Sequence, residues 1–209
     1  MRRILYLHGF ASGPGSGKAC FLTGQIRARG VDLEVPDLAA GDFEHLTISS
    51  QLQVVETLTR GDAVSLIGSS LGGYLAALYA ARHIETHRVV LMAPAFGFGR
   101  RWPESLGPEK MAAWKKAGEI EVFHYADGRA RKLGYALLED GQRYEDYPDF
   151  RQPALVFHGV HDEVVPVRYS EEFAAAHPNV RLEVLNSGHE LLDVLEYMAS
   201  RTLDFLLRD

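Results

Sequence analysis

The sequence predicts an α/β domain built on a mostly parallel sheet with helices on both faces. Short apolar runs typical of buried strands alternate with longer runs of helical spacing along most of the 209 residues. A Gly-x-Ser-x-Gly sequence, residues 68–72, joins one such strand to the next helix. The alternation stops at about residue 95 and resumes at about residue 151. We therefore expect one domain over residues 1–209 with a small cap-like insertion at 95–151.

In the first half of the chain, apolar periodicity and turn residues predict seven elements. Strands are expected where apolar residues follow one another or alternate, at residues 3–7, 31–36, 63–67 and 88–92. Helices are expected where apolar residues recur every three or four positions, at residues 18–29, 46–58 and 70–82. Gly30 ends the first helix and Gly61 forms a turn after the second.

The second half opens with the insertion, where the pattern changes. Residues 103–118 are predicted to form a helix, and residues 119–125 and 132–138 a hairpin around a central Asp-Gly turn. Residues 144–153 are polar and aromatic and predict a loop. The alternation of strands and helices then resumes, with strands at residues 154–157 and 181–185 and helices at residues 167–176 and 190–207.

Composition and charge narrow the class of protein. The net charge of -6 without a basic block disfavours binding to nucleic acid or to an anionic membrane. No apolar run reaches the roughly 18 residues of a membrane-spanning helix, and the run before His8 is too short for a signal peptide. The single cysteine, Cys20, allows no internal disulfide and fits a reducing compartment. We expect a cytoplasmic protein; its oligomeric state stays open.

The strongest catalytic signal is Ser70. It lies between Gly68 and Gly72, directly after a predicted strand and before a predicted helix. A turn this sharp requires residues with almost no side chain two positions before and after the serine. Ser69 fails this requirement, because its flanking positions hold Ile67 and Leu71. The local sequence therefore selects Ser70 as a candidate nucleophile, against the alternative of a simple Gly/Ser turn.

A serine hydroxyl needs an adjacent base that is oriented by a third group. Asp162 and His189 each follow a predicted strand, as Ser70 does. The carboxyl ends of parallel strands meet at one edge of a sheet, where such folds place their ligand sites. Glu163 is an alternative acid, and Asp162 and His189 could instead serve a turn and a helix start. The joint placement predicts a Ser70–His189–Asp162 triad.

Four segments carry a family resemblance. They read LYLHGF at residues 5–10, GSSLGGY at 68–74, HGVHDEVVP at 158–166 and SGH at 187–189. These resemble the α/β-hydrolase superfamily, and are most similar to its small bacterial esterases and to palmitoyl-protein-thioesterase-like serine hydrolases. The resemblance implies the α/β-hydrolase fold and hydrolysis of a small-molecule carboxylic ester or thioester without a cofactor. It also implies Ser70 as nucleophile, His189 as base and Asp162 as orienting acid, in the family's chain order.

The same resemblance supplies an oxyanion hole. In this fold the hole is made by the backbone N–H after the nucleophile and by an N–H from the loop after an early strand. Leu71 follows the serine, and Phe10 is the favoured donor of the loop that begins at His8. Because only its backbone is required, the Phe10 side chain is free to line an acyl pocket.

Aromatic residues in or beside the insertion are candidates for an acyl pocket or for core packing. They are Phe96, Phe98, Trp102 and Trp114. The neighbouring pair Arg100 and Arg101 is either a solvated surface pair or, if it faces the site, an attraction for an acidic substrate.

Two other signals are set aside. Residues 13–18 superficially suggest a phosphate loop, but Ser12 and Ala19 occupy positions that the P-loop fingerprint reserves for glycine and a hydroxyl residue. His158 and His161 are three residues apart, but no third ligand lies nearby in the sequence, and we expect no metal site. Two alternatives to ester hydrolysis stay open: cleavage of peptide or C–C bonds by the same triad, and a ligand receptor on this fold.

Overall fold

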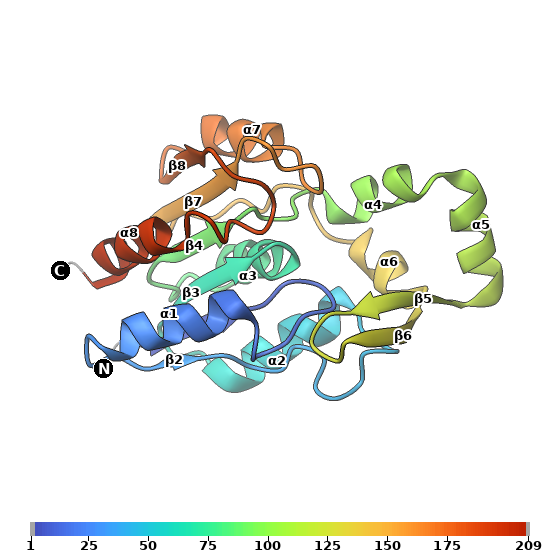
Figure 1. Cartoon of the computed structure of the whole chain (residues 1–209), viewed down its shortest axis with the longest axis horizontal. Helices are drawn as coiled ribbons and strands as arrows, with labels where there is room; N and C mark the ends of the chain where they lie inside the picture. Colours follow the sequence, from blue (N-terminus) through green and yellow to red (C-terminus); the bar gives the residue numbers. More distant parts are fainter. Residues whose placement is uncertain (1–2, 208–209) are drawn as a thin grey trace.

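A six-stranded parallel sheet forms the centre of the computed structural model, which describes residues 3–207 (Figure 1). The strand order across the sheet is β2-β1-β3-β4-β7-β8. Neighbouring strands pair in parallel, so their carboxyl ends meet at one edge of the sheet. The strands are β1 (Arg3–Leu7), β2 (Leu33–Glu34), β3 (Val64–Ser69), β4 (Val89–Met92), β7 (Ala154–Gly159) and β8 (Val180–Leu185).

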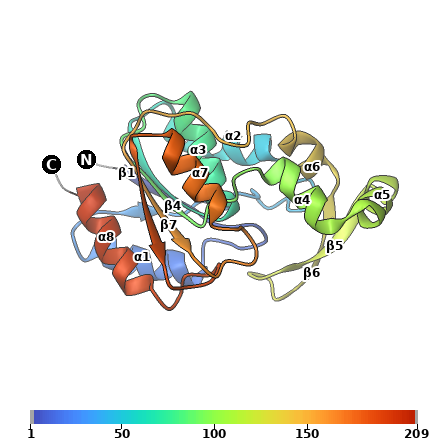
Figure 2. The same ribbon diagram turned by 90° about the horizontal axis from the view of Figure 1, so that it is seen from above.

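Helices cover both faces of the sheet (Figure 2). One face carries α1 (Gly17–Arg27) and α8 (Leu195–Leu207), and the other carries α2 (Ile48–Thr59), α3 (Leu71–Arg82) and α7 (Arg168–Ala176). Side chains alternate between these faces along β1: Leu5 and Leu7 pack toward α2 and α3, whereas Ile4 and Tyr6 pack toward α1 and α8. The predicted α/β fold with a parallel sheet is confirmed.

The segment between β4 and β7 projects beyond the end of the sheet (Figures 1 and 2). Its elements are α4 (Phe98–Leu106), α5 (Pro108–Ala117), the antiparallel pair β5 (Glu119–His124) and β6 (Arg129–Gly134), and α6 (Ala136–Gly141). The hairpin is joined to the loops that follow β1 and β2. Tyr125 N–H donates to the Ala11 carbonyl at 2.7 Å, and Gly134 N–H donates to the Glu44 carbonyl at 2.8 Å.

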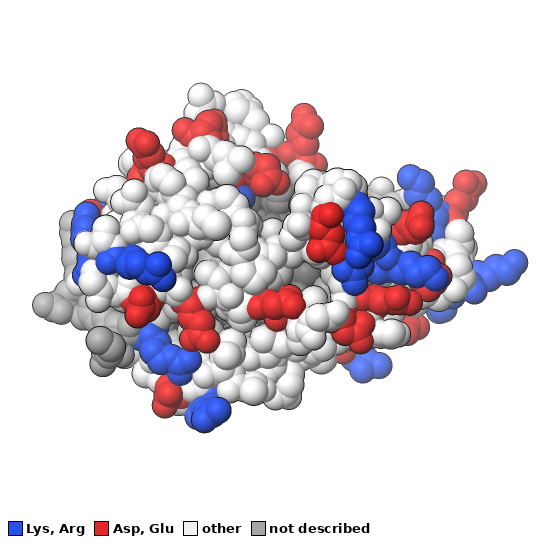
Figure 3. All heavy atoms as spheres, turned by 60° about the horizontal axis from the view of Figure 1, so that its bottom comes forward, with Lys and Arg blue, Asp and Glu red and all other residues white. Residues whose placement is uncertain are grey.

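Charge on the hairpin end is mixed. On the face shown in Figure 3, acidic and basic side chains are intermingled over this end, and no basic tract crosses the face. Ion pairs join Lys132 to Glu119 and Arg131 to Asp127. Within residues 3–207, no helix combines the length and the apolar character needed to cross a bilayer.

Two predictions within the insertion were wrong. The expected helix at residues 103–118 is two helices, because Gly107 takes a left-handed φ of 78° between α4 and α5. The second hairpin strand spans Arg129–Gly134 rather than residues 132–138, and residues 136–141 are helical instead. Pairing of His124 with Arg129 across a four-residue turn sets this register.

Two further boundaries differ from those predicted. The last helix begins at Leu195 rather than at residue 190, because the chain turns at Leu191, a buried residue with a left-handed φ of 56°. The second strand is limited to Leu33–Glu34, since only these residues pair with β1. Neither difference displaces the loops that carry the candidate catalytic residues.

Candidate active site

Ser70 lies at the sharp turn between β3 and α3, with the backbone strain that a nucleophile elbow requires. Its φ of 52° and ψ of −117° are unusual for a residue with a side chain. A Cβ on Gly68 would lie 2.3 Å from the Gly72 carbonyl oxygen, and one on Gly72 would lie 2.1 Å from the Leu7 carbonyl oxygen. Both glycines are therefore required by close backbone contact, as the sequence predicted.

Hydrogen bonds to β4 and the residues after it hold this strained turn in place. Ser70 N–H donates to the Met92 carbonyl at 2.9 Å, and Ala95 N–H donates to the Ser70 carbonyl at 3.0 Å. Such a conformation costs about 1–3 kcal/mol and persists only where its surroundings enforce it. The turn is thus supported by the parallel strand beside it.

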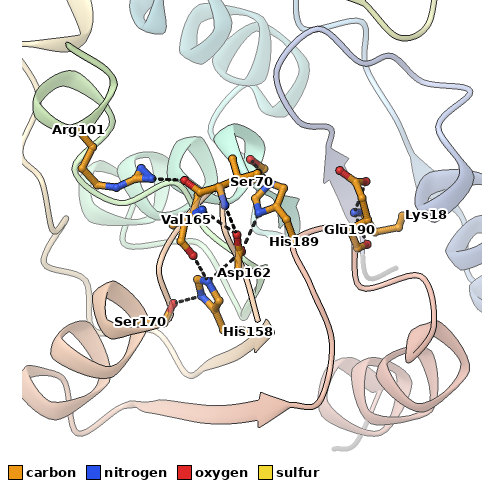
Figure 4. A network of polar contacts seen from close by, with 10 residues as sticks. Lys18, Ser70, Arg101, His158, Asp162, Val165, Ser170, His189 and Glu190 are labelled. Carbon is orange, nitrogen blue, oxygen red and sulfur yellow. Dashed lines mark hydrogen bonds and ion pairs between the residues drawn. The ribbon is translucent and has the colours of Figure 1, made fainter. Parts of the chain in front are cut away.

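The structure brings Ser70, His189 and Asp162 into one hydrogen-bonded chain (Figure 4). His189 Nδ1 lies 2.7 Å from Asp162 Oδ2, and His189 Nε2 lies 3.0 Å from Ser70 Oγ. A carboxylate only accepts hydrogen bonds, so Nδ1 carries the ring proton and Nε2 is left to accept from the serine hydroxyl. This is the arrangement in which the imidazole can take the serine proton.

Asp162, and not Glu163, is the carboxylate at His189. Its side chain is fully buried, and its Oδ1 accepts hydrogen bonds from Val164 N–H at 2.9 Å and Val165 N–H at 2.7 Å. Glu163 is exposed. Burial opposes ionisation of Asp162, but hydrogen bonds from His158, His189 and the Val165 amide outweigh it and hold the pKa of this carboxyl well below its usual value.

A second histidine supports the same carboxylate. His158 is fully buried, and its Nε2 lies 3.1 Å from Asp162 Oδ2 and 2.7 Å from the Val165 carbonyl oxygen. Its Nδ1 lies 2.7 Å from Ser170 Oγ. The sequence suggested for His158 only a metal pair with His161 and a place in the segment 158–166 that carries the family resemblance. The signal that could have found it is its spacing of four residues from Asp162 around one turn.

His158 and His161 do not share a site. His161 is exposed, and its Nε2 lies 2.9 Å from Asn186 Oδ1, whereas His158 points into the core toward Asp162. Over residues 3–207, no three histidine, cysteine or acidic side chains cluster in a way that could hold a metal ion.

The two backbone amides predicted for an oxyanion hole lie beside Ser70. Leu71 contributes the first amide of α3, and Phe10 follows Gly9, where an added Cβ would lie 3.5 Å from the Ser70 Cβ. Neither amide donates to an acceptor within residues 3–207. Unpaired amides at a helix start favour negative charge, so this geometry is suited to an oxyanion.

The aromatic residues of the insertion divide into two groups. Trp102 and Trp114 line a cleft of about 500 Å³ between α4, α5 and β5. Phe96 has no exposed surface and packs on Phe173 of α7, with ring centroids 4.3 Å apart. Phe98 is buried against Trp102 at 5.1 Å. Phe96 and Phe98 do not line this cleft, and their side chains are buried in the core, which is one of the two roles that the sequence left open.

Lys18, for which the sequence predicted no such role, holds the loop that carries His189, called the histidine loop. Lys18 Nζ donates to the Glu190 backbone carbonyl at 2.7 Å and lies 3.5 Å from the Glu190 carboxylate (Figure 4). The Lys18 side chain is only 10% exposed, and burial lowers its pKa. The glycine-rich loop before it therefore leads into a structural contact that joins α1 to the residue after His189. No local pattern reveals a partner 172 residues away.

Solved structures with the α/β-hydrolase fold align with this chain over nearly its whole length. A protein from Agrobacterium vitis S4 is 23% identical with a TM-score of 0.83, covering 96% of this chain and 86% of its own. The mouse alpha/beta hydrolase domain-containing protein 10 is 18% identical with a TM-score of 0.81, covering 97% and 88%. The monoacylglycerol lipase of Paleococcus ferrophilus is 16% identical with a TM-score of 0.77, covering 97% and 93%.

These similarities establish the α/β-hydrolase fold that the sequence resemblance implied. A family model described as "Uncharacterised protein family (UPF0227)" matches residues 3–206, which include every element of the sheet and all the candidate catalytic residues. The chain therefore belongs to the UPF0227 family and has the α/β-hydrolase fold.

Proposed function

We propose that this protein is a serine hydrolase that cleaves a carboxylic ester or thioester through an acyl-enzyme intermediate. The observation that carries the proposal is the continuous hydrogen-bonded chain from Ser70 through His189 to Asp162, built on a strained strand-to-helix turn. A structural serine at a turn would need neither the positive φ nor a histidine at hydrogen-bond distance.

The geometry supports a specific sequence of proton transfers. Ser70 Oγ attacks the carbonyl carbon while His189 Nε2 takes its proton. The amides of Phe10 and Leu71 stabilise the negative oxygen of the tetrahedral intermediate. His189 then gives the proton to the departing alcohol or thiol, and a water molecule activated by the same nitrogen releases the acid. Asp162 holds the imidazole in the required tautomer and stabilises its protonated form.

Two further observations favour ester or thioester substrates. The proposed oxyanion amides donate to no acceptor among the described residues, which leaves them available to a developing carbonyl oxygen. One of the structures that share the fold is named a monoacylglycerol lipase, and lipases cleave carboxylic esters.

The test is hydrolysis of matched p-nitrophenyl esters, acyl thioesters and peptide anilides by the wild type and by Ser70→Ala. We expect turnover of esters or thioesters that falls by at least about 1,000-fold in Ser70→Ala, because residual rates come only from binding and the oxyanion hole. Ser69→Ala is the matched control, since it makes the same change one residue earlier in a buried strand position.

Two results would contradict the proposal. One is turnover of the anilides with none of the esters or thioesters, which would assign the triad to peptide bonds. The other is ester turnover that Ser70→Ala and Ser69→Ala reduce to the same small extent.

A further inference from the structure

Helix α4 contacts both of the loops that flank Ser70. On one side, the Trp102 ring packs on Phe10, with centroids 5.3 Å apart, and Phe10 follows the glycine that lies against Ser70. On the other side, Arg101 Nη2 donates to the Val164 carbonyl at 2.8 Å. Val164 is part of the loop that holds Asp162. Residues 101 and 102 therefore lie between two loops. One carries Phe10 and is called the oxyanion loop; the other carries Asp162 and Val164 and is called the acid loop.

Arg101 is a half-buried cation on this face of α4. Figure 4 shows its guanidinium pointing from α4 toward the acid loop beside Ser70. The guanidinium carbon Cζ lies 4.9 Å from the centre of the Tyr169 ring. The ring packs against the guanidinium and fixes its position. Tyr169 is itself buried, so the stack is held by the protein core.

The charge of Arg101 is not paired with a carboxylate in the part of the chain that the structure describes. Among residues 3–207, no carboxylate lies within ion-pair distance of it. Arg100, the residue before it, is exposed and pairs with Asp146 at 2.7 Å and Glu104 at 3.7 Å. Buried or half-buried charges in proteins are normally paired. The two neighbouring arginines therefore differ: Arg100 is in a surface ion pair, whereas Arg101 is a cation that contacts the acid loop and pairs with no carboxylate of the described residues.

The groups around Arg101 also act on its charge. Burial lowers the pKa of Arg101, although a guanidinium stays protonated at any ordinary pH. The Tyr169 phenol and then the Asp162 carboxylate act on this pKa in the opposite direction, but that carboxylate is already engaged by two histidines. Arg168 also lies over the Tyr169 ring, at 5.1 Å, and adds a second positive charge near that ring.

We propose that Arg101 binds an anionic group of the substrate, a carboxylate or a phosphate, so that the ester or thioester cleaved at Ser70 carries a negative charge. The guanidinium donates from Nη2 to the Val164 carbonyl and hydrogen-bonds the Tyr169 side chain, and of its five N–H donors others remain for an anion. Arginine matches the planar geometry of carboxylates and phosphates. The protein has a net charge of -6, so an anionic substrate needs such a local cation at the site.

The inference rests on the proposed function and extends it to a substrate class. It is tested with three pairs of substrates that differ in one charged group. The acyl side is tested by phenyl hemisuccinate against phenyl methyl succinate. A carboxylate on the leaving group is tested by 4-carboxyphenyl butyrate against its methyl ester. A phosphate on the leaving group is tested by the butyryl thioester of 4′-phosphopantetheine against that of pantetheine.

The readout is the ratio of kcat/KM for the charged member to that for the neutral member of each pair. We expect the wild type to favour the charged member in at least one pair, and Arg101→Gln to lower that ratio by roughly 10- to 100-fold, the usual strength of a hydrogen bond to a charged group. Arg100→Gln is the matched control and should leave the ratio as in the wild type. The pair that responds identifies the source of the negative charge.

A structural role for Arg101 gives a different result. If Arg101 only tied α4 to the acid loop, Arg101→Gln would lower both members of a pair equally and leave the ratio unchanged, and this would overturn the inference. A wild-type preference for the neutral member in all three pairs would also overturn it. If no substrate is turned over and Ser70 proves unreactive, the proposed function fails and the inference fails with it.

Discussion

Substituting Gly72 by alanine tests the physical basis of the turn at Ser70. The added Cβ would lie 2.1 Å from the Leu7 carbonyl oxygen and 2.5 Å from the His8 carbonyl oxygen. Both atoms belong to backbone at the end of β1, where the candidate oxyanion loop begins. To reach ordinary contact at 3.4 Å, that backbone must move by about 1 Å.

The displacement should affect stability and activity together. Overpacking of this kind costs about 1–3 kcal/mol of unfolding free energy, and 2 kcal/mol lowers Tm by roughly 4–8 °C in a chain of this size. A shift of about 1 Å in a catalytic group can cost about 100-fold in rate. We therefore expect Gly72→Ala to lose stability by this amount and to lose about 100-fold in kcat for ester hydrolysis.

The assay compares urea unfolding and ester kinetics of Gly72→Ala with those of Gly24→Ala. An added Cβ at Gly24, in the exposed middle of α1, meets nothing within 4 Å. That control should gain up to about 1 kcal/mol from helix propensity and keep full activity. The reasoning is refuted if Gly72→Ala matches the wild type in both measurements, since the close contact with the oxyanion loop would then have no consequence.

Three other substitutions separate catalysis, loop positioning and core packing. Asp162→Asn should lose about 10⁴-fold in kcat through the wrong imidazole tautomer. The folded protein depresses the pKa of Asp162 below its usual 3.8, so Asp162→Asn should also have a lower free energy of unfolding than the wild type at pH 7. This difference in unfolding free energy should shrink as the pH falls below 3.8, and an equal difference at pH 7 and pH 3 would contradict the reasoning. Lys18→Met should lower kcat about 10-fold with little change in KM, because the histidine loop loses its tether to α1; unchanged kcat would show that Lys18 does not position the loop. Phe96→Ala should cost about 3–5 kcal/mol in urea unfolding and leave acyl-length preference unaltered, and a changed preference without lost stability would return Phe96 to the pocket.

The sequence predicted most of the sheet and the candidate triad because both depend on local patterns. Most strands are apolar or alternating runs, and each candidate catalytic residue lies in the loop or turn that follows one, so parallel pairing brings the residues to one edge. The glycines around Ser70 carried the same information locally, since the turn excludes side chains at both positions.

What the sequence did not predict depends on contacts between distant segments. The hairpin register follows from pairing across a short turn and from the contact of Gly134 with Glu44. The tether from Lys18 to Glu190 joins opposite ends of the chain. The different surroundings of Arg100 and Arg101 follow from where α4 lies against the acid loop.

The most direct test of the central proposal is covalent trapping of the nucleophile. The protein is incubated with a fluorophosphonate, and the intact mass and the modified peptide are measured by mass spectrometry. We predict one adduct for each chain, located on Ser70, formed in the wild type and in Ser69→Ala but not in Ser70→Ala. An unmodified wild type, or an adduct that forms equally in Ser70→Ala, would contradict the assignment of Ser70 as the nucleophile of a hydrolase.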